Sequence, residues 1–397
     1  MLWHDAVMTA FLLLWLAAQA VSVLFVWLFT IGLGRPVSVS TLPPVAVIVA
    51  VKGHGSVLDG FLGRLFEQDY PFFRVIFAVE SAADPAVAAM MPYCSKYPER
   101  IDLVIAGLSS DEGQKVANLR AALLHVTSAD EILLFADADI WPERDWLKRL
   151  IAPLVRGEAD VVSGYTWLVA HDRHLATFVM ASMSAALVTI PRLPLFNAAW
   201  GGSTAIWRDQ FDALGIAQAW RGTLSDDLQL TQVAKRAGCT IAAPREILPR
   251  IAVTTGGFAA VADDALRWFM LFRVHMPATY AIALVTMTFL AVGWVVAIIG
   301  ALAGQGTGLA ALMAAFVLAL MRTAGRAVIV ARLWGRTGLR ENGLFWAIDP
   351  VVTPLASILN AVYGWCALFL RQTTWAGITY EIRGPQQVKV LSRRSAN

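Results

Sequence analysis

The segments LLFADADIWP, at residues 133–142, and SDDLQLTQVAKRAG, at residues 225–238, decide the fold of this chain. The first is an aliphatic run that ends in two carboxylates one residue apart, Asp137 and Asp139. Such a run predicts a buried strand, and the residues directly after it lie at the carboxyl edge of a parallel sheet, where α/β folds bind ligands. Carboxylates at that edge suit a hard divalent cation that holds a diphosphate. A chance turn with two exposed acids is the alternative, and the strand before them favours the site.

Short apolar runs alternate with helical patterns through the middle of the chain. This alternation predicts an α/β, Rossmann-like domain with a parallel sheet covered on both faces, which is a nucleotide-binding architecture. The expected strands are 45–51, 75–80, 101–107, 131–139 and 160–166, and the expected helices are 56–67, 112–126 and two that begin at Asp84-Pro85 and at Pro142.

Long uncharged stretches flank this domain and raise the apolar content of the 397 residues to 57%. Residues 6–34 carry no charge and would span about 43 Å as a helix, against about 30 Å of hydrocarbon. The stretch is too long for a signal peptide, and the first arginine, Arg35, follows it. We therefore expect a retained transmembrane helix with its N-terminus outside and the α/β domain in the cytoplasm.

The C-terminal part predicts further membrane elements. Residues 277–303 and 308–331 are expected to span the membrane, with a basic loop inside the cell that holds Arg332, Arg336 and Arg340. The stretch 345–370 contains a charge and two prolines, so a re-entrant or interfacial element is favoured there. The apolar run 174–190 is short for a span and is expected along the membrane face or under the sheet. The expected domains are 1–40 (membrane helix), 41–275 (catalytic), 276–371 (membrane helices) and 372–397 (basic tail).

The charge and the cysteines exclude other classes. A formal net charge of +3 is too small to indicate nucleic-acid binding. The three cysteines are far apart and odd in number, which indicates neither a disulfide framework nor a zinc site, and suits a reducing compartment.

Two further motifs have both a structural and a chemical interpretation. Asp226 and Asp227 open a helical run, where acidic residues ordinarily cap the helix and complement its dipole. Arg267 and Trp268 precede the second membrane block, where basic and aromatic residues ordinarily anchor a helix. Alternatively, Arg267 contacts a phosphate and Trp268 stacks on a sugar or acceptor. Their order after the DxD pair favours the chemical interpretation.

Taken together, these motifs resemble glycosyltransferase family 2 enzymes of the GT-A type. In detail the chain is similar to family 21, the ceramide glucosyltransferases, and to bacterial relatives linked to hopanoid lipids. The stretches that carry the resemblance are VKG at 51–53, 65–86, KVANL at 115–119, 169–178, MPAT at 276–279 and TWAGITYEIRG at 374–384.

The resemblance implies an inverting transfer of a sugar from a UDP-sugar donor to a lipid hydroxyl, with Mg²⁺ or Mn²⁺. It implies a multi-pass protein of a bacterial inner membrane that acts on the cytoplasmic face. By residue it implies a nucleotide pocket formed by Lys52, Glu80, Asp84 and Lys115, and a metal and diphosphate site at Asp137 and Asp139. It also implies that Asp227 is the catalytic base and that Arg267 and Trp268 lie on the diphosphate and acceptor side.

Three positions depart from the family pattern. Asp264 stands where a glutamine or arginine opens the motif that ends in Arg267-Trp268, and Glu80 with Ser81 stands where an aspartate is usual. Ile190 stands where the ceramide enzymes have a histidine, which puts ceramide itself in doubt as the acceptor.

The sequence leaves three rival functions open. A processive polysaccharide synthase needs more membrane helices and a glutamine at 264, and a polyprenyl-phosphate sugar transferase ranks beside it. A non-catalytic membrane scaffold with a degenerate transferase domain predicts lost carboxylates, yet Asp137, Asp139 and Asp227 are present. The sugar, the lipid and the oligomeric state do not follow from the sequence.

Overall fold

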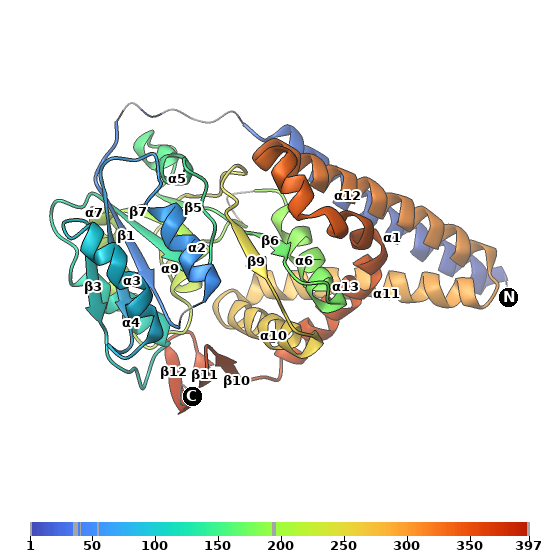
Figure 1. Cartoon of the computed structure of the whole chain (residues 1–397). Coiled ribbons are helices and arrows are strands. Elements are labelled where there is room, and N and C mark those ends of the chain that lie inside the picture. The colour runs from blue at the N-terminus through green and yellow to red at the C-terminus, as the bar shows by residue number, and fades with distance from the viewer. Residues whose placement is uncertain (1, 35–38, 40, 54, 193–195, 395–397) are drawn as a thin grey trace.

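The structure is a computed structural model that describes residues 2–34, 39, 41–53, 55–192 and 196–394. An α/β domain lies at one end and a bundle of long helices at the other, with the N-terminus at the far tip of the bundle (Figure 1). The α/β and membrane parts predicted from the sequence are both present.

A seven-stranded sheet forms the centre of the α/β domain, in the order β3-β2-β1-β4-β7-β5-β8. The expectation of a wholly parallel sheet is wrong, because β7 runs antiparallel between β4 and β5. β7 has only five residues and begins with two buried hydroxyl side chains, so no apolar run marked it in the sequence. The strands are β1 (Val45–Ala50), β2 (Phe73–Val79), β3 (Ile101–Ile105), β4 (Ile132–Asp137), β5 (Val161–Ser163), β7 (Ser203–Trp207) and β8 (Ile241–Ala242).

Two apolar cores lie on opposite faces of this sheet, and alternate residues of β1 point into each. Val47 and Val49 pack in one core and Ala46 and Ile48 in the other, as the two-residue period of a strand requires. The first core is covered by α2 (Ser56–Leu65), α3 (Pro85–Lys96) and α5 (Trp146–Val155). The second is covered by α4 (Gln114–Leu123), α7 (Arg208–Ala213), α8 (Ile216–Ala219) and α9 (Asp226–Arg236).

The helix expected from Pro142 begins four residues later, at Trp146. Trp141 donates its backbone N–H to the carbonyl of Arg250 at 2.7 Å, and this bridge holds the intervening segment in a non-helical path.

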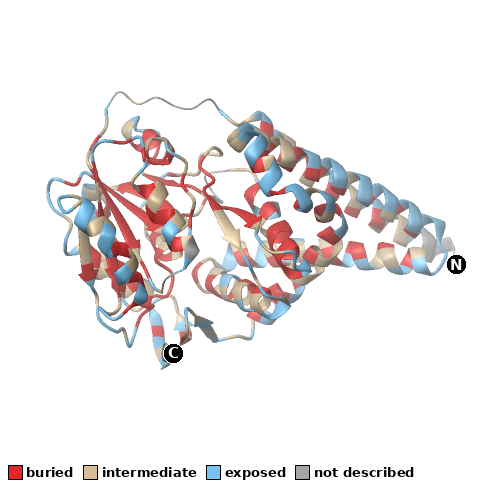
Figure 2. Cartoon of the chain, in the orientation of Figure 1, coloured by how far each residue is buried: buried red, intermediate tan, exposed pale blue. Residues whose placement is uncertain are grey.

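A second layer joins the α/β domain to the helix bundle. It consists of the two-stranded parallel sheet of β6 (Trp167–Ala170) and β9 (Arg250–Val253), with α6 (Leu175–Val188) and α10 (Phe258–His275). α6 packs on β6 and on the last long helix, α13 (Gly343–Ala367), and is buried on most sides (Figure 2). The stretch expected at the membrane face or under the sheet therefore lies at their junction.

Among the residues that the structure describes, four helices are long and apolar enough to cross a membrane: α1 (Leu2–Ile31), α11 (Pro277–Leu302), α12 (Gly306–Glu341) and α13. The expected basic loop at 332–340 is wrong, because these residues are helical on both sides of a kink at Gly335, whose φ of 62° and ψ of −149° are not helical. The stretch 345–370, for which a re-entrant or interfacial element was expected, is mostly the single helix α13. Its placement relative to a membrane stays a prediction.

The charge that argued against a span in α13 is compensated inside the bundle. Asp349 is buried and accepts hydrogen bonds from Arg326 Nη1 at 2.8 Å, from Ser182 Oγ at 2.7 Å and from Thr323 Oγ1 at 2.6 Å. The carboxylate thus joins α6, α12 and α13 and does not face lipid.

The expected basic tail is folded. Residues after α13 form the antiparallel sheet of β10 (Gln372–Trp375), β11 (Ile378–Gly384) and β12 (Gln387–Arg393). This C-terminal sheet lies under the α/β domain, beside α4 (Figure 1). The description of 372–397 as a tail is therefore wrong for the residues described.

Candidate active site

Carboxylates from two distant segments meet at one lysine. Asp137 ends β4, and its Oδ1 lies 2.7 Å from Nζ of Lys115, on the first turn of α4. Oδ1 of Asp226, the first residue of α9, lies 3.3 Å from the same Nζ. The convergence expected from the two opening motifs is therefore present at the carboxyl edge of the sheet.

The charges at this lysine reinforce one another. Burial alone would lower the pKa of Lys115, but Asp137, Asp226 and Asp227 outweigh it and hold the pKa above its usual range. Burial raises the pKa of Asp226 to about 6, with Lys115 acting against that rise. Lys115 is thus a permanent cation that faces an excess of carboxylates.

Asp139 lies two residues beyond Asp137 and is exposed. Crowding by protein atoms and the charge of Asp137 raise the pKa of Asp139 to about 7, with Lys115 acting in the opposite sense. Among the described residues, no group of three or more His, Cys, Asp or Glu side chains forms a complete metal cage. Two carboxylates nevertheless fit a Mg²⁺ or Mn²⁺ ion that takes its remaining ligands from substrate phosphates.

Asp227 is held at both carboxylate oxygens. Oδ1 accepts hydrogen bonds from Ser225 Oγ at 2.5 Å and from the Leu228 N–H at 2.7 Å, and Oδ2 accepts from the Gly201 N–H at 3.0 Å. Ser225 is also the N-cap of α9. The capping and the chemical interpretations of this motif therefore hold together, since the helix start fixes the orientation of a half-buried carboxylate.

The sequence did not predict the role of the loop that precedes β7. A Cβ atom on Gly201 would lie 2.7 Å from Lys115 Nζ and 2.8 Å from Asp226 Oδ2, so any larger residue there must displace one of these charged groups or the loop. The ring of Trp200 covers Gly202 in the same way. The available signal was the triplet WGG at 200–202.

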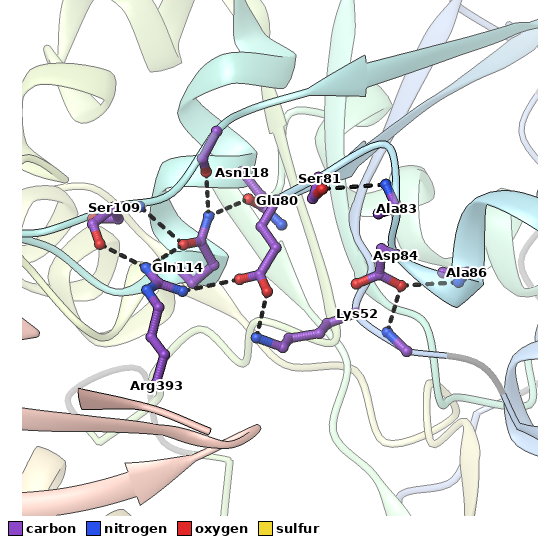
Figure 3. Close-up of polar contacts among 12 residues, drawn as sticks. Lys52, Glu80, Ser81, Ala83, Asp84, Ala86, Ser109, Gln114, Asn118 and Arg393 are labelled. Atoms are coloured by element: carbon purple, nitrogen blue, oxygen red, sulfur yellow. Dashed lines mark hydrogen bonds and ion pairs between the residues drawn. The ribbon is translucent and has the colours of Figure 1, made fainter. Parts of the chain in front are cut away.

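Three of the four side chains expected to bind the nucleotide, Lys52, Glu80 and Asp84, follow the ends of β1 and β2 (Figure 3), whereas the fourth, Lys115, lies on α4. Lys52 Nζ lies 2.7 Å from Glu80 Oε1. Asp84 has a local structural role, since its Oδ1 accepts the N–H groups of Gly53 and Ala86 at 2.9 Å each and caps α3. Arg393, from β12, also contacts Glu80, and sequence reasoning did not identify it.

His275 is a buried group, close enough to Asp227 to feel its charge, that the sequence did not indicate. It ends α10, and its backbone carbonyl accepts a hydrogen bond from Gln232 Nε2 of α9. Burial lowers the pKa of His275 to about 4, with Asp227 acting against the fall. The imidazole is therefore neutral at physiological pH.

Comparison with known proteins identifies the family. The model of the family described as glycosyl transferase family 21 matches residues 7–388. The chain belongs to glycosyl transferase family 21. It is therefore a glycosyltransferase, and its catalytic domain has the GT-A fold.

Solved structures support the fold of this family 21 chain. The mannosyltransferase PcManGT from Pyrobaculum calidifontis, in complex with GDP-Man and Mn²⁺, is 22% identical with a TM-score of 0.52, covering 83% of this chain and 99% of that one. S. aureus TarS in complex with UDP-GlcNAc is 12% identical with a TM-score of 0.39, covering 88% and 100%. The likeness to the mannosyltransferase is the one that supports the GT-A fold.

The last motif of the family 21 pattern lies apart from the carboxylates. Arg267 Nη2 pairs with Asp264 Oδ1 at 2.8 Å, and its guanidinium stacks on Trp375 of β10 at 5.2 Å. Trp268 is 43% exposed. Among the described residues, no hydrogen bond or ion pair joins Arg267 or Trp268 to the carboxylates. Asp264, the departure from the pattern, thus neutralises the arginine expected to meet phosphate.

Proposed function

We propose that this family 21 chain transfers a sugar from a UDP-sugar to the hydroxyl group of a membrane lipid, ceramide-like or hopanoid-like, with inversion at the anomeric carbon. The observation that carries the proposal is the meeting of Asp137, Asp226 and Asp227 around Lys115, in a domain attached to four apolar helices.

The donor side requires neutralisation of the departing diphosphate. Asp137 and Asp139 would hold Mg²⁺ or Mn²⁺, which supplies positive charge to the leaving group when bound. Lys115 adds a fixed cation within 2.7 Å of Asp137. Lys52 and Glu80 lie at the ends of β1 and β2, where the nucleoside is expected. The presence of GDP-Man and Mn²⁺ in the mannosyltransferase complex supports this arrangement by analogy.

Asp227 is the proposed general base. Its carboxylate takes the proton of the acceptor hydroxyl as that oxygen forms a bond to the anomeric carbon. The bond from that carbon to the diphosphate oxygen breaks in the same step, and the diphosphate leaves with the electron pair. A single displacement of this kind inverts the anomeric centre. The hydrogen bonds to both Asp227 oxygens orient the carboxylate for this task.

The membrane helices account for a lipid acceptor. α10 carries Arg267 and Trp268 and leads directly into the apolar helix α11. Attachment of the domain to the membrane holds its active site at the depth of lipid headgroups, which reduces the entropy cost of bringing the reactants together. The first arginine of the chain, Arg35, follows the uncharged N-terminal block, which favours a cytoplasmic position for this face.

The test uses the purified full-length chain in detergent with UDP-glucose, UDP-galactose, UDP-GlcNAc and GDP-mannose, Mg²⁺ or Mn²⁺, and a total lipid extract. Mass spectrometry should find one lipid class that gains one hexose or N-acetylhexosamine from a UDP-sugar. Asp227→Asn should lower turnover by about 10²- to 10⁴-fold. The matched control, Asp212→Asn, changes an exposed carboxylate on α7 and should keep wild-type turnover.

Four results would overturn parts of this proposal. Absence of any glycosylated lipid, or full turnover by Asp227→Asn, would contradict the reaction and the base. A ladder of products with many sugars would indicate a processive synthase. Transfer from GDP-mannose alone would contradict the uridine donor.

A further inference from the structure

The C-terminal sheet is docked on the catalytic domain through its backbone. The Val388 N–H donates to the Gly222 carbonyl at 3.1 Å, and the Val390 N–H donates to the Ser110 carbonyl at 2.9 Å. Gly222 has φ +72°, and a Cβ atom there would lie 2.5 Å from the carbonyl oxygen of Gln386. The sheet and the domain are therefore in close contact at two loops.

An apolar core holds the sheet in place independently of its charged residues. Ile378, Tyr380, Ile382 and Val388 are buried against Leu224 and two residues of α10, Met270 and Leu271. Leu224 directly precedes the N-cap of α9, so the sheet supports the loop that leads to Asp227.

From this platform the last residue of β12, Arg393, reaches the nucleotide side of the site (Figure 3). Its Nη1 lies 3.1 Å from Glu80 Oε2, and its Nη2 donates to the Ser109 carbonyl at 2.6 Å and to Gln114 Oε1 at 2.7 Å. The side chain is 22% exposed. One guanidinium thus connects the end of β2 with the start of α4.

These contacts fix the two groups that they meet. Glu80 has Lys52 on Oε1 and Arg393 on Oε2, so both carboxylate oxygens are oriented. Gln114 donates from Nε2 to the Gly107 carbonyl and to Asn118 Oδ1, both at 2.8 Å, and accepts from Arg393 on Oε1. Gln114 immediately precedes Lys115, the lysine at the centre of the carboxylates.

We propose that β12 is part of the donor site and that Arg393 is a positioning residue for it, acting through Glu80. This inference rests on the proposed function, because it assigns Glu80 to the nucleoside. A carboxylate there accepts hydrogen bonds from the N–H of a base or from ribose hydroxyls, which demands a fixed orientation. Loss of Arg393 frees Glu80 Oε2 while the apolar core keeps the sheet docked, and Gln114 Oε1 keeps only its hydrogen bond from the Ser109 N–H.

The experiment compares Arg393→Gln, Arg393→Lys and the control Arg383→Gln in the full-length chain in detergent. Arg383 lies on β11 of the same sheet, is 68% exposed and, within the part of the chain that the structure describes, pairs only with Glu381. Arg393→Gln should raise the donor KM and the Kd for UDP about tenfold, with kcat within about twofold of wild type. The donor KM and the Kd for UDP of Arg393→Lys should lie between those of wild type and Arg393→Gln, because lysine keeps the charge but lacks the planar, forked donors of the guanidinium. Arg383→Gln should match wild type.

A double variant separates positioning from a merely structural role. If Arg393 acts through Glu80, then Glu80→Gln/Arg393→Gln should bind UDP within about twofold of Glu80→Gln alone. Independent, multiplicative losses would overturn the inference, as would a wild-type KM and Kd in Arg393→Gln. If Arg393→Gln does not fold, a wild-type KM in Arg393→Lys overturns it.

The wild-type chain separates this inference from the proposed function. Titration with UDP and GDP comes first. If wild type binds neither and transfers no sugar, the proposed function fails and takes this inference with it. If wild type binds UDP and Arg393→Gln binds it equally well, only the inference fails.

Discussion

Two groups of buried charge in this chain follow opposite rules. In the helix bundle, Asp349 is paired with Arg326 and accepts from two hydroxyl donors, and a second buried arginine, Arg322, donates to Gln19 and Ser22. In the catalytic domain, one lysine, Lys115, faces Asp137, Asp226 and Asp227, with the exposed Asp139 beside them. A carboxylate that is paired and hydrogen-bonded makes a structural joint, whereas surplus negative charge is unfavourable until a cation arrives. The comparison indicates which charges serve folding and which serve chemistry.

The largest expected effect tests the surplus of negative charge around Lys115. Asp139→Asn should lower turnover by at least about 10²-fold, because a carboxylate suited to the metal is lost. Its thermal stability should stay equal to wild type or rise, because one of several like charges has gone. Turnover and thermal unfolding of the same preparation measure both. If Asp139→Asn lowered the thermal stability as clearly as it lowers turnover, Asp139 would have a structural role like that of Asp349.

The balanced pair should respond in the reverse way. Asp349→Asn should destabilise the chain by about 3–5 kcal/mol, because Arg326 is left buried without its counter-charge. Chemical unfolding in detergent measures this loss. UDP binding by the protein that remains folded should be unchanged.

The pair has its own control. Arg326→Met/Asp349→Leu removes both charges and should recover much of the stability that Asp349→Asn loses. Wild-type stability in the single variant would show that the pair contributes nothing.

His275 is a buried histidine whose pKa is determined mainly by burial. Its pKa in the folded chain, about 4, lies below the ordinary value of 6.5 because burial disfavours the charged form. The unfolded chain therefore binds a proton first, so stability is fully present above pH 6.5 and falls as the pH drops from 6.5 towards 4. The loss should reach about 3 kcal/mol at most.

Thermal unfolding between pH 4 and pH 7 checks this slope. His275→Gln should flatten it, whereas His125→Gln, which changes an exposed histidine, should leave it intact. An unaltered slope in His275→Gln would assign the acid sensitivity to other groups.

The smallest expected effect concerns the position of Lys115, the lysine that the excess carboxylates surround. Gly201→Ala puts a methyl group 2.7 Å from Lys115 Nζ, so the lysine or the loop must shift. Turnover should fall about tenfold, because small displacements of a catalytic group are costly. Gly63→Ala is the control, since its Cβ would meet nothing within 4 Å. Equal turnover in both variants would show that Lys115 tolerates displacement.

Much of the catalytic domain could be predicted from local pattern. The aliphatic runs identified β1 to β5, and the start of α9 could be recognised from its acidic first turn. These elements could be predicted because a strand or a helix cap is encoded within a few neighbouring residues. Asp137 and Asp139 were expected from the end of one such strand, whereas Lys52, Glu80 and the role of Asp227 came from the family resemblance, and the roles of all five residues stay predictions.

The remaining parts depend on contacts between segments far apart in the chain. The antiparallel strand β7 is placed by its neighbours β4 and β5, and Gly201 is required only because Lys115 and Asp226 arrive beside it. Arg393 lies 313 residues from Glu80 in the sequence. The apolar pattern of α13 gives no indication of the strands that follow it, so the contact between β12 and Glu80 could not be predicted.

The sequence by itself determined the α/β pattern, the carboxylates at a strand end and a helix start, and the apolar helices, because periodicity and composition act over short stretches. Only the tertiary structure decided that Asp349 is neutralised by Arg326, that Arg267 is occupied by Asp264, and that the C-terminal residues form a sheet beside Glu80. A charge acquires its role from the groups that surround it in space, and those groups come together only when the chain is folded.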